Sequence, residues 1–248
     1  QMWDKGLLYQ GFKVVPYCPR CGTPLSDHEV AQGYDDATDP SVFVRMPLAD
    51  DPGTSLLVWT TTPWTLPSNV AVAAGEEVDY VKVERALEEG GTEKLILAQA
   101  LLEKVFRGEE AKVLDTFKGK KLKGLRYQPL FTFLPPDKPA HYVIFGDFVT
   151  TEDGTGLVHI APAFGADDMR VAMEHDLPVI MTVAPDGTFI PEVTPWRGQF
   201  VKDADPFITQ DLLNRGLLYR AETYTHTYPF CWRCKTPLLY YAREAWYI

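Results

Sequence analysis

Short runs of apolar and β-branched residues recur along most of the chain, and turn residues separate them. Runs of this length and composition are typical of β-strands. We expect strands at residues 42–46, 56–60, 70–73, 80–83, 95–97, 141–145, 157–160 and 177–183, with further strand segments between 113 and 133. So many short strands favour a sheet-rich fold over a helix bundle or a Rossmann fold.

Helical patterns are fewer than strand patterns. Residues 98–107 repeat apolar side chains at helical spacing, a second helix should follow the loop that ends near residue 165, and a third should cover 205–215. These helices are too few to form a core by themselves, so we expect them at the edges of the sheets. The predicted fold class is mainly β with peripheral helices (α+β), built around a closed β-barrel.

The stretch from Leu56 to Asn69 begins as a buried strand and then changes character. Pro63 and Pro67 each remove a backbone donor, so strand pairing should end where several threonines gather. These threonines are Thr60, Thr61, Thr62 and Thr65. A strand that ends among hydroxyls and free N–H groups indicates a small polar pocket. A threonine-rich strand followed by a proline turn is the alternative interpretation.

A second polar group lies in residues 154–168. A glycine turn leads into a strand that carries His159, and a loop follows before the next predicted helix. Asp167 and Asp168 fall in the first turn of that helix, where free N–H groups and the helix dipole favour carboxylates. Two other interpretations therefore stay open: one of the aspartates caps the helix, and His159 is a hydrogen-bonded residue of the core. No Gly-x-Gly-x-x-Gly or Walker sequence is present, which argues against phosphate binding by a glycine loop.

The four cysteines of the chain form two Cys-x-x-Cys pairs near its two ends, each in a unit that ends in Thr-Pro-Leu. They are Cys18, Cys21, Cys231 and Cys234. Four thiolates complete a closed tetrahedral zinc site, which would have a structural role and would tie the chain ends together. Disulfides and a redox dithiol are the alternatives. Disulfides fit poorly in a chain this long that is not otherwise rich in cysteine, and a redox dithiol would want a single motif in a βαβ setting. His28 and His226 lie near the pairs and could form a mixed site instead.

Composition and charge narrow the function classes. The chain has 248 residues, of which 46% are hydrophobic, and a formal net charge of −10. This acidity argues against nucleic-acid binding driven by overall charge, although Lys118 to Arg126 form a local basic strip. No run approaches the roughly 20 apolar residues that span a bilayer, so we expect no membrane partner.

The two polar stretches together resemble a known family. TTTPWTLPSN over residues 60–69 and GTGLVHIAP over 154–162 are similar to the editing insertion of isoleucyl-tRNA synthetases, and the resemblance covers essentially the whole chain. Valyl and leucyl relatives usually have Arg-Pro where this chain has Thr62-Pro63-Trp64. Phe164 departs from the pattern, since many bacterial members place a second histidine there.

The resemblance implies a function, the hydrolysis of valyl-tRNA(Ile). This reaction follows amino-acid transfer and is a second selection step against valine. Valyl-adenylate is left open as a further substrate. The signatures of ATP-dependent amino-acid activation are absent, so that step would belong to the remainder of the synthetase, a partner in cis. The other implied partners are the 3′ end of mischarged tRNA(Ile) and its valine moiety, and the implied location is cytoplasmic. The implied domains are a zinc-knuckle base at 1–40 and 205–248 and a β-barrel editing domain at 41–204.

The resemblance also implies site residues. Asp168 would bind the α-ammonium group of the substrate and Asp167 would cap the helix, or the reverse. Thr60, Thr61 and Thr62 would surround the ester carbonyl and the attacking water. The remaining implied contacts to the substrate are Trp64, Thr65, Asn69 and His159, of which Thr65 and His159 would bar the larger isoleucine.

Two other function classes compete with this hypothesis. A non-catalytic zinc-ribbon module that binds RNA or protein would explain the cysteines and the basic strip, but not two polar clusters within apolar strands. A zinc hydrolase would need an open metal position, and the sequence has no His-Glu-x-x-His motif.

Overall fold

The computed structural model describes residues 2–87 and 90–247. Its largest sheet has six strands in the order β11-β3-β4-β7-β6-β8. All neighbours in this sheet are antiparallel except β4 and β7, which are parallel. The strands are β3 (Tyr34–Pro47), β4 (Thr54–Thr60), β6 (Asp79–Ala86), β7 (Thr92–Ala98), β8 (Lys112–Lys118) and β11 (Leu218–Pro229).

A second sheet of three short strands lies against the first. Its order is β10-β5-β9, with β5 (Ala71–Ala74) between β9 (Tyr142–Phe145) and β10 (Leu157–Ile160). Every residue of β5 is buried, because the strand has a neighbour on each edge and side chains packed on both faces. Strand β10 pairs antiparallel with β5 and also lies beside β4. This contact brings the end of the threonine-rich strand close to the strand that carries the predicted histidine.

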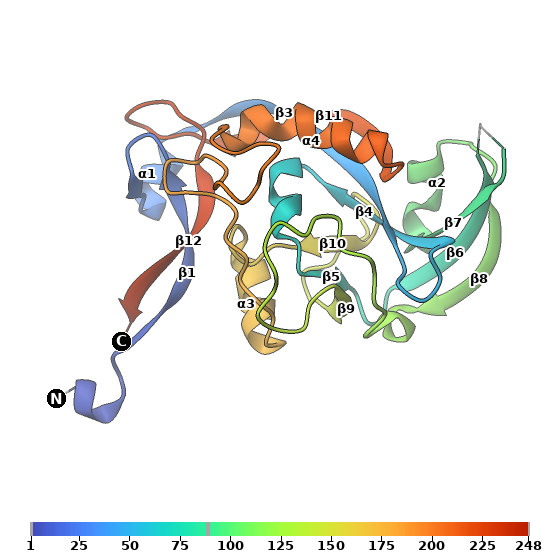
Figure 1. The fold of residues 1–248 in the computed structure, drawn as a ribbon, viewed down its shortest axis with the longest axis horizontal. Coiled ribbons are helices and arrows are strands. Elements are labelled where there is room, and N and C mark those ends of the chain that lie inside the picture. Colours follow the sequence, from blue (N-terminus) through green and yellow to red (C-terminus); the bar gives the residue numbers. More distant parts are fainter. Residues whose placement is uncertain (1, 88–89, 248) are drawn as a thin grey trace.

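The third sheet joins the two ends of the chain. β1 (Tyr9–Cys18) pairs with β12 (Leu239–Tyr247) along nearly its whole length, and β2 (Thr23–Pro24) completes the sheet. The two long strands form an arm that projects from the body of the molecule and carries both termini (Figure 1). The N-terminal strand β1 and the C-terminal strand β12 therefore run side by side. The paired cysteine units had predicted that the two ends of the chain meet.

The helices are short and lie around the sheets (Figure 1). Predicted helices form at η3 (Gln99–Leu101) with α2 (Leu102–Phe106), at α3 (Ala166–Glu174) and at α4 (Val201–Asn214), which begins four residues earlier than expected. The others are η1 (Trp3–Lys5), α1 (Asp27–Ala31), η2 (Pro63–Ser68) and η4 (Gly119–Leu122), where η denotes a 3-10 helix. The fold is thus mixed α+β and mostly sheet, as predicted.

The prediction of a closed barrel is wrong for the described residues, since none of the three sheets closes on itself. Isolated bridges from Leu48 to Tyr127 and from Arg126 to Tyr142 link the end of β3 in the six-stranded sheet to β9 in the β10-β5-β9 sheet. On the other side, β4 and β10 are neighbours without a hydrogen-bonded ladder. Closure would require a ladder between these two strands, and the packing of the sheets brings them into contact without one.

Two of the expected strand regions also differ. Residues 177–183 contribute buried side chains but make only one bridge, Val183 to Phe189, because Pro178 and nearby turns interrupt regular pairing. Between 113 and 133 the structure has a single strand, β8, followed by the 3-10 helix η4. Apolar content predicted burial correctly in both regions, but not the backbone pairing.

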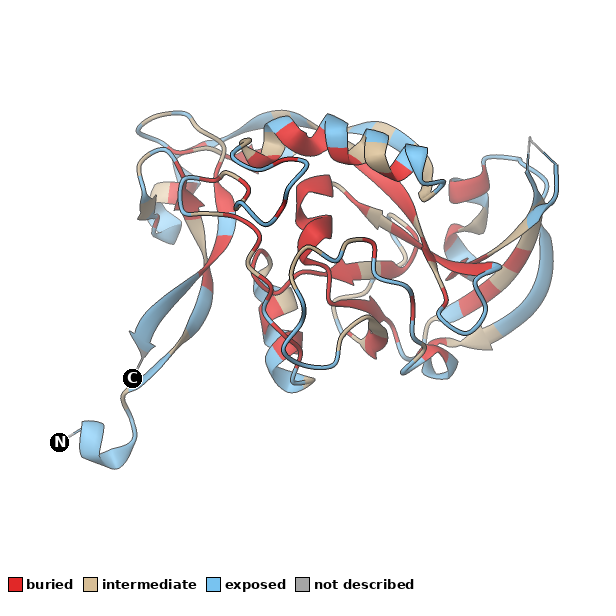
Figure 2. Ribbon diagram, viewed as in Figure 1, coloured by how far each residue is buried: buried red, intermediate tan, exposed pale blue. Residues whose placement is uncertain are grey.

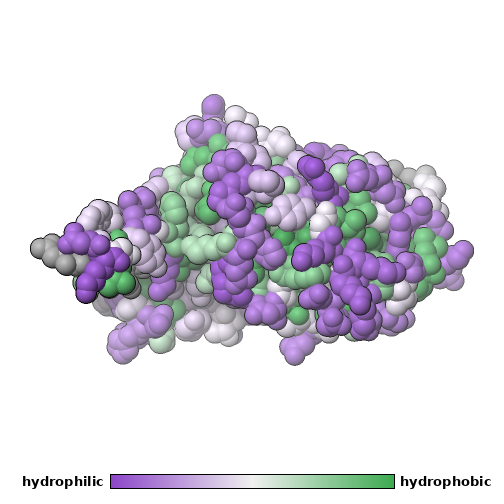
Figure 3. Space-filling model, turned by 90° about the horizontal axis from the view of Figure 1, so that it is seen from below, coloured by the Kyte–Doolittle hydropathy of each residue, from purple (hydrophilic) through white to green (hydrophobic). Residues whose placement is uncertain are grey.

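Burial is concentrated in the body of the molecule, and the outer part of the β1–β12 arm is exposed (Figure 2). The main hydrophobic core fills the space enclosed by the six-stranded sheet, η2 and α4, and a smaller cluster lies between β5 and α3. The face drawn in Figure 3 is mostly hydrophilic, with hydrophobic residues in separate small groups. Among the described residues, no helix combines the length and the apolar character that crossing a bilayer requires.

Candidate functional site

A cavity of about 220 Å³ lies where the end of β4 meets β10 and the start of α3. It combines hydroxyls, one imidazole and one carboxylate with apolar walls. Its lining residues are Trp59, Thr60, Thr62, Thr65, Val158, His159, Ala161, Phe164, Gly165 and Asp168. Both polar stretches of the sequence therefore contribute to one cavity. Its volume is below the range of roughly 300–1,000 Å³ that holds drug-sized ligands, so it suits a small group.

The threonines form one hydrogen-bonded group at the edge of this cavity. The Thr60 hydroxyl lies 3.2 Å from that of Thr62 and also accepts the Thr62 backbone N–H at 3.1 Å. The Thr62 and Thr65 hydroxyls are 3.1 Å apart, and Thr65 donates to the Thr62 carbonyl at 2.8 Å. This geometry arises because Pro63 starts η2, whose turn brings Thr65 back over Thr62.

His159 closes the inner end of the cavity. Its side chain is buried on β10, and Nε2 lies 2.8 Å from the Thr65 hydroxyl. Burial lowers the pKa of His159 to about 4, since a charged imidazole would lose its hydration there. The ring is therefore neutral near pH 7. The direct contact with Thr65 joins the two polar stretches, which are more than 90 residues apart in the sequence.

Asp168 supplies the carboxylate of the cavity from the first turn of α3. One of its oxygens accepts the backbone N–H of Ala161 at 2.8 Å, which holds the side chain toward β10. Burial raises the pKa of Asp168 to about 7, although this hydrogen bond opposes the shift. A half-buried carboxylate of this kind would be stabilised in its ionised form by a bound cation.

Four predicted site residues do not line the cavity. Thr61 is half-buried beside it, and Asn69 lies behind His159, with its amide nitrogen 3.4 Å from Nδ1. Trp64 is buried against Phe164, with ring centroids 5.1 Å apart, so it packs behind a residue that lines the cavity. Asp167, the fourth, points away to solvent.

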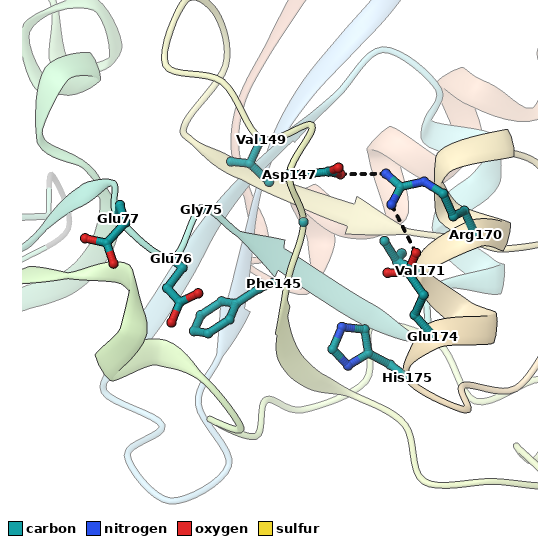
Figure 4. Close-up of a pocket in the computed structure, with 11 residues that line it drawn as sticks. Gly75, Glu76, Glu77, Phe145, Asp147, Val149, Arg170, Val171, Glu174 and His175 are labelled. Atoms are coloured by element: carbon teal, nitrogen blue, oxygen red, sulfur yellow. Dashed lines mark hydrogen bonds and ion pairs between the residues drawn. The ribbon is translucent and has the colours of Figure 1, made fainter.

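Behind α3 lies a different and larger cavity of about 630 Å³, which Arg170 lines and Asp167 does not. There the guanidinium of Arg170 binds Asp147 at 2.6 Å, Glu174 at 3.2 Å and Asp167 at 3.4 Å. Figure 4 shows Arg170 directed from its helix toward the first two of these carboxylates. Asp167 and Asp168 point in different directions, because successive helical residues are about 100° apart around the axis.

Five lining residues were not predicted as site residues. Trp59, Val158 and Ala161 provide apolar walls, Phe164 had been noted only as a departure from the family pattern, and Gly165 is the N-cap of α3. The signal available for Trp59 was its position next to Thr60. Nothing in the sequence distinguishes Val158 or Ala161 from other buried residues of β10 and its loop.

The four cysteines form a separate cluster at the base of the β1–β12 arm. Their sulfur atoms all lie within 4.8 Å of one another, with Cys18 and Cys234 3.4 Å apart and Cys21 and Cys231 4.0 Å apart. Tetrahedral zinc with Zn–S bonds of about 2.3 Å separates its thiolates by about 3.8 Å, so the donor set fits such an ion. The cluster includes no histidine: His28 is exposed, and His226 binds Asp39 at 3.0 Å.

The fold matches solved editing domains of aminoacyl-tRNA synthetases. The editing domain of a P. knowlesi cytosolic leucyl-tRNA synthetase superposes with a TM-score of 0.57 at 11% identity, covering 79% of this chain and 99% of that one. The structure of GlLeuRS-CP1 gives a TM-score of 0.55 at 12% identity, over 75% of this chain and 99% of that one. At this identity the likeness shows the fold alone: the chain has the fold of these two synthetase domains.

The sequence assigns the family directly. Residues 1–248 match the family model of class I tRNA synthetases (I, L, M and V), and the chain belongs to this family. An isoleucine–tRNA ligase of Clostridium acetobutylicum is 55% identical over the whole chain, and one of Thermus thermophilus is 49% identical. The chain spans 23% of the length of each of these relatives. The resemblance seen in the two motifs is thereby confirmed.

Proposed function

We propose that this chain is the editing unit of an isoleucine–tRNA ligase and hydrolyses the ester that links valine to tRNA(Ile). The observation that carries the proposal is the single small cavity in which Thr60, Thr62, Thr65, His159 and Asp168 meet. One methylene allows a binding site only about 1–3 kcal/mol of discrimination, an estimate for which isoleucine against valine is the standard case. A second, smaller cavity in which the wrongly charged tRNA is hydrolysed supplies the remaining discrimination.

Recognition of the substrate begins at Asp168. Its carboxylate binds the α-ammonium group of valine, and this cation favours the ionised form of a group whose pKa is about 7 in the free protein. Thr65, His159 and Phe164 then bound the space left for the amino-acid side chain. Valine fits between them, and the extra methylene of isoleucine does not.

Hydrolysis requires a water molecule at the ester carbonyl carbon. The water oxygen bonds to this carbon and the bond to the ribose oxygen breaks. One proton of the water passes to the ribose oxygen, which releases valine and the 3′ end of the tRNA. Thr60 and Thr62 lie at the carbonyl, with Thr61 beside them. Their hydroxyl oxygens can accept hydrogen bonds from the attacking water, and N–H groups of this stretch stabilise the negative charge that develops on the carbonyl oxygen. As the group that helps to activate this water we propose a ribose hydroxyl of the terminal adenosine, whose oxygen can accept a hydrogen bond from the water. Valyl-adenylate, which carries the same acyl group, is a second candidate substrate.

The cysteine cluster completes the proposal. Zinc bound by Cys18, Cys21, Cys231 and Cys234 has no open coordination position, so it stabilises the base of the arm and takes no part in hydrolysis. The proposed base comprises 1–40 and 205–248, and the editing domain 41–204; β3 crosses the first boundary and α4 the second. The remainder of the synthetase, in the cytoplasm, delivers the mischarged tRNA.

A deacylation assay tests this function. The chain should release valine from valyl-tRNA(Ile) at a rate well above that in buffer and should leave isoleucyl-tRNA(Ile) intact. Binding of the tRNA without hydrolysis would instead support a non-catalytic RNA-binding module, which explains the cysteine cluster but not the polar cavity.

A further inference from the structure

The amide of Asn69 is fixed in one orientation by two buried partners. Its nitrogen donates to the carbonyl of Ala71 at 2.9 Å, and its oxygen accepts the hydroxyl of Tyr127 at 2.7 Å. A carbonyl oxygen can only accept, so the nitrogen must face Ala71, and the amide oxygen is left for Tyr127. Asn69 and Tyr127 are 4% and 2% exposed, which makes an unpaired amide or hydroxyl costly at this position.

This orientation determines where His159 carries its proton. The second N–H of the Asn69 amide points to Nδ1 of His159, 3.4 Å away. An amide nitrogen is only a donor, so Nδ1 must accept and carries no hydrogen. A neutral imidazole has one N–H, which then lies on Nε2 and donates to the Thr65 hydroxyl at 2.8 Å.

We propose that Tyr127 is a positioning residue for the cavity: together with the Ala71 carbonyl it holds the Asn69 amide, which keeps neutral His159 in the Nε2–H tautomer and thereby sets the direction of the threonine hydrogen bonds. The inference rests on the proposed hydrolysis for its functional consequence, but not for the tautomer itself. Tyr127 does not line the cavity, and it belongs to neither polar stretch of the sequence.

The threonine hydrogen bonds follow from this tautomer one by one. Thr65 accepts from His159 and gives its own proton to the Thr62 carbonyl at 2.8 Å. In the 3.1 Å contact between the two hydroxyls, Thr62 must therefore donate to Thr65. The Thr60 hydroxyl, at 3.2 Å, then donates to Thr62. The protons of all three hydroxyls point along the chain of threonines, which leaves lone pairs of Thr60 and Thr62 to accept hydrogen bonds from a water in the cavity.

Tyr127 is suited to this role by its surroundings. It lies on the short link between the six-stranded sheet and the β10-β5-β9 sheet, where Leu48 bridges to it, and its ring packs edge-on against His141. Burial raises its pKa well above the usual 10, so the hydroxyl remains a donor at every pH at which the protein would be assayed. Its partner Asn69 therefore receives the same hydrogen bond throughout that range.

The test is nitrogen NMR of the 248-residue chain with ¹⁵N-labelled histidine, in which the two ring nitrogens report the tautomer. His159→Gln assigns the signals. We expect protonated Nε2 and bare Nδ1 in the wild type, and a mixture of tautomers in Tyr127→Phe. Tyr228→Phe is the matched control, because Tyr228 is also buried and its hydroxyl donates to a backbone carbonyl, that of Leu238.

Deacylation of valyl-tRNA(Ile) gives the second readout. Loss of one buried hydrogen bond that orients the site should lower kcat about tenfold in Tyr127→Phe with little change in KM. An unchanged His159 tautomer in Tyr127→Phe, or protonated Nδ1 in the wild type, overturns the proposal. If Tyr127→Phe does not fold, Asn69→Ser removes the amide and must shift the tautomer in the same way. A wild type with the expected tautomer but no hydrolysis would remove the proposed function and leave the Tyr127–Asn69–His159 linkage standing.

Discussion

Gly165 and Asp168 lie so close together that a β-carbon on Gly165 would be 2.6 Å from the carboxyl carbon of Asp168. The φ angle of Gly165 is −142°, which any residue can adopt. Glycine is therefore required for space and not for backbone conformation. It allows the first turn of α3 to direct the Asp168 carboxylate back into the cavity, toward the N–H of Ala161.

Gly165→Ala should consequently impair editing without unfolding the protein. We expect the displaced carboxylate to reduce hydrolysis of valyl-tRNA(Ile) by about tenfold or more, as loss of a well-placed charged contact would. Gly53→Ala is the control, because a β-carbon there meets its nearest atom at an ordinary 3.6 Å. Equal rates for the two variants, measured by release of labelled valine, would contradict the steric argument.

Asp168→Asn should reduce that hydrolysis at least about 100-fold, since the α-ammonium group would lose its only proposed anionic partner. Its neighbour provides a matched control. Asp167→Asn changes an exposed carboxylate that binds Arg170, so it should retain most of the activity. In the wild type, kcat/KM should rise as pH increases through about 7, where Asp168 ionises, and this inflection should be absent from the residual rate of Asp168→Asn.

His159→Ala should weaken the exclusion of isoleucine. The change enlarges the inner end of the cavity, and a difference of one methylene is worth roughly 10–200-fold in a tight apolar site, so the relative rate on isoleucyl-tRNA(Ile) should rise by a factor in that range. The ratio of the two deacylation rates is the measurement. If isoleucyl-tRNA(Ile) stays fully protected, His159 serves only the structure of the cavity.

Asp205 should make stability depend on pH. Its buried carboxylate accepts the Trp64 N–H at 2.8 Å, and burial raises its pKa to about 8. Between about pH 4 and pH 8 the folded protein therefore binds a proton that the unfolded chain releases, so this group makes the unfolding free energy fall as pH rises through that window. Asp205→Asn removes this pH dependence. The unfolding free energy of the variant, relative to that of the wild type, should therefore be higher at pH 8 than at pH 5.

Urea unfolding at pH 5 and at pH 8 measures the difference in unfolding free energy between Asp205→Asn and the wild type. Asp203→Asn, on the exposed side of the same helix, is the control and should show a smaller change with pH. A constant difference between Asp205→Asn and wild type at both pH values would show that burial does not perturb Asp205 in this way.

Removal of the proposed zinc should destabilise the protein before it affects the chemistry. Cys21→Ser should lose the bound ion and lower Tm by about 10 °C, because metal binding contributes to folding free energy. His28→Ala should leave the metal content unchanged, since His28 is exposed and outside the sulfur cluster. Metal content by elemental analysis and Tm by calorimetry are the measurements. A protein with full Tm and no metal would exclude a structural ion.

Much of the site could be predicted from the sequence because its chemistry is local. The threonines are followed at once by prolines that end the strand, so their hydroxyls lie at a strand end. Asp168 falls at the start of a helix, which places its carboxylate at a helix end. The paired cysteine units similarly predicted that the two chain ends meet. The closed barrel could not be predicted correctly, since closure depends on whether β4 and β10 pair, and that is set by how the sheets pack.

The sequence by itself determined which residue types were available for catalysis, where strands and helices begin, and to which family the chain belongs. Only the tertiary structure decided that Asp168, and not Asp167, faces the cavity, and that Tyr127 and Gly165 support it. The physical reason is that these relations depend on contacts across strands and helices that are far apart along the chain. Local sequence sets backbone propensity, whereas the direction of a hydrogen bond depends on which partner packing brings within about 3 Å.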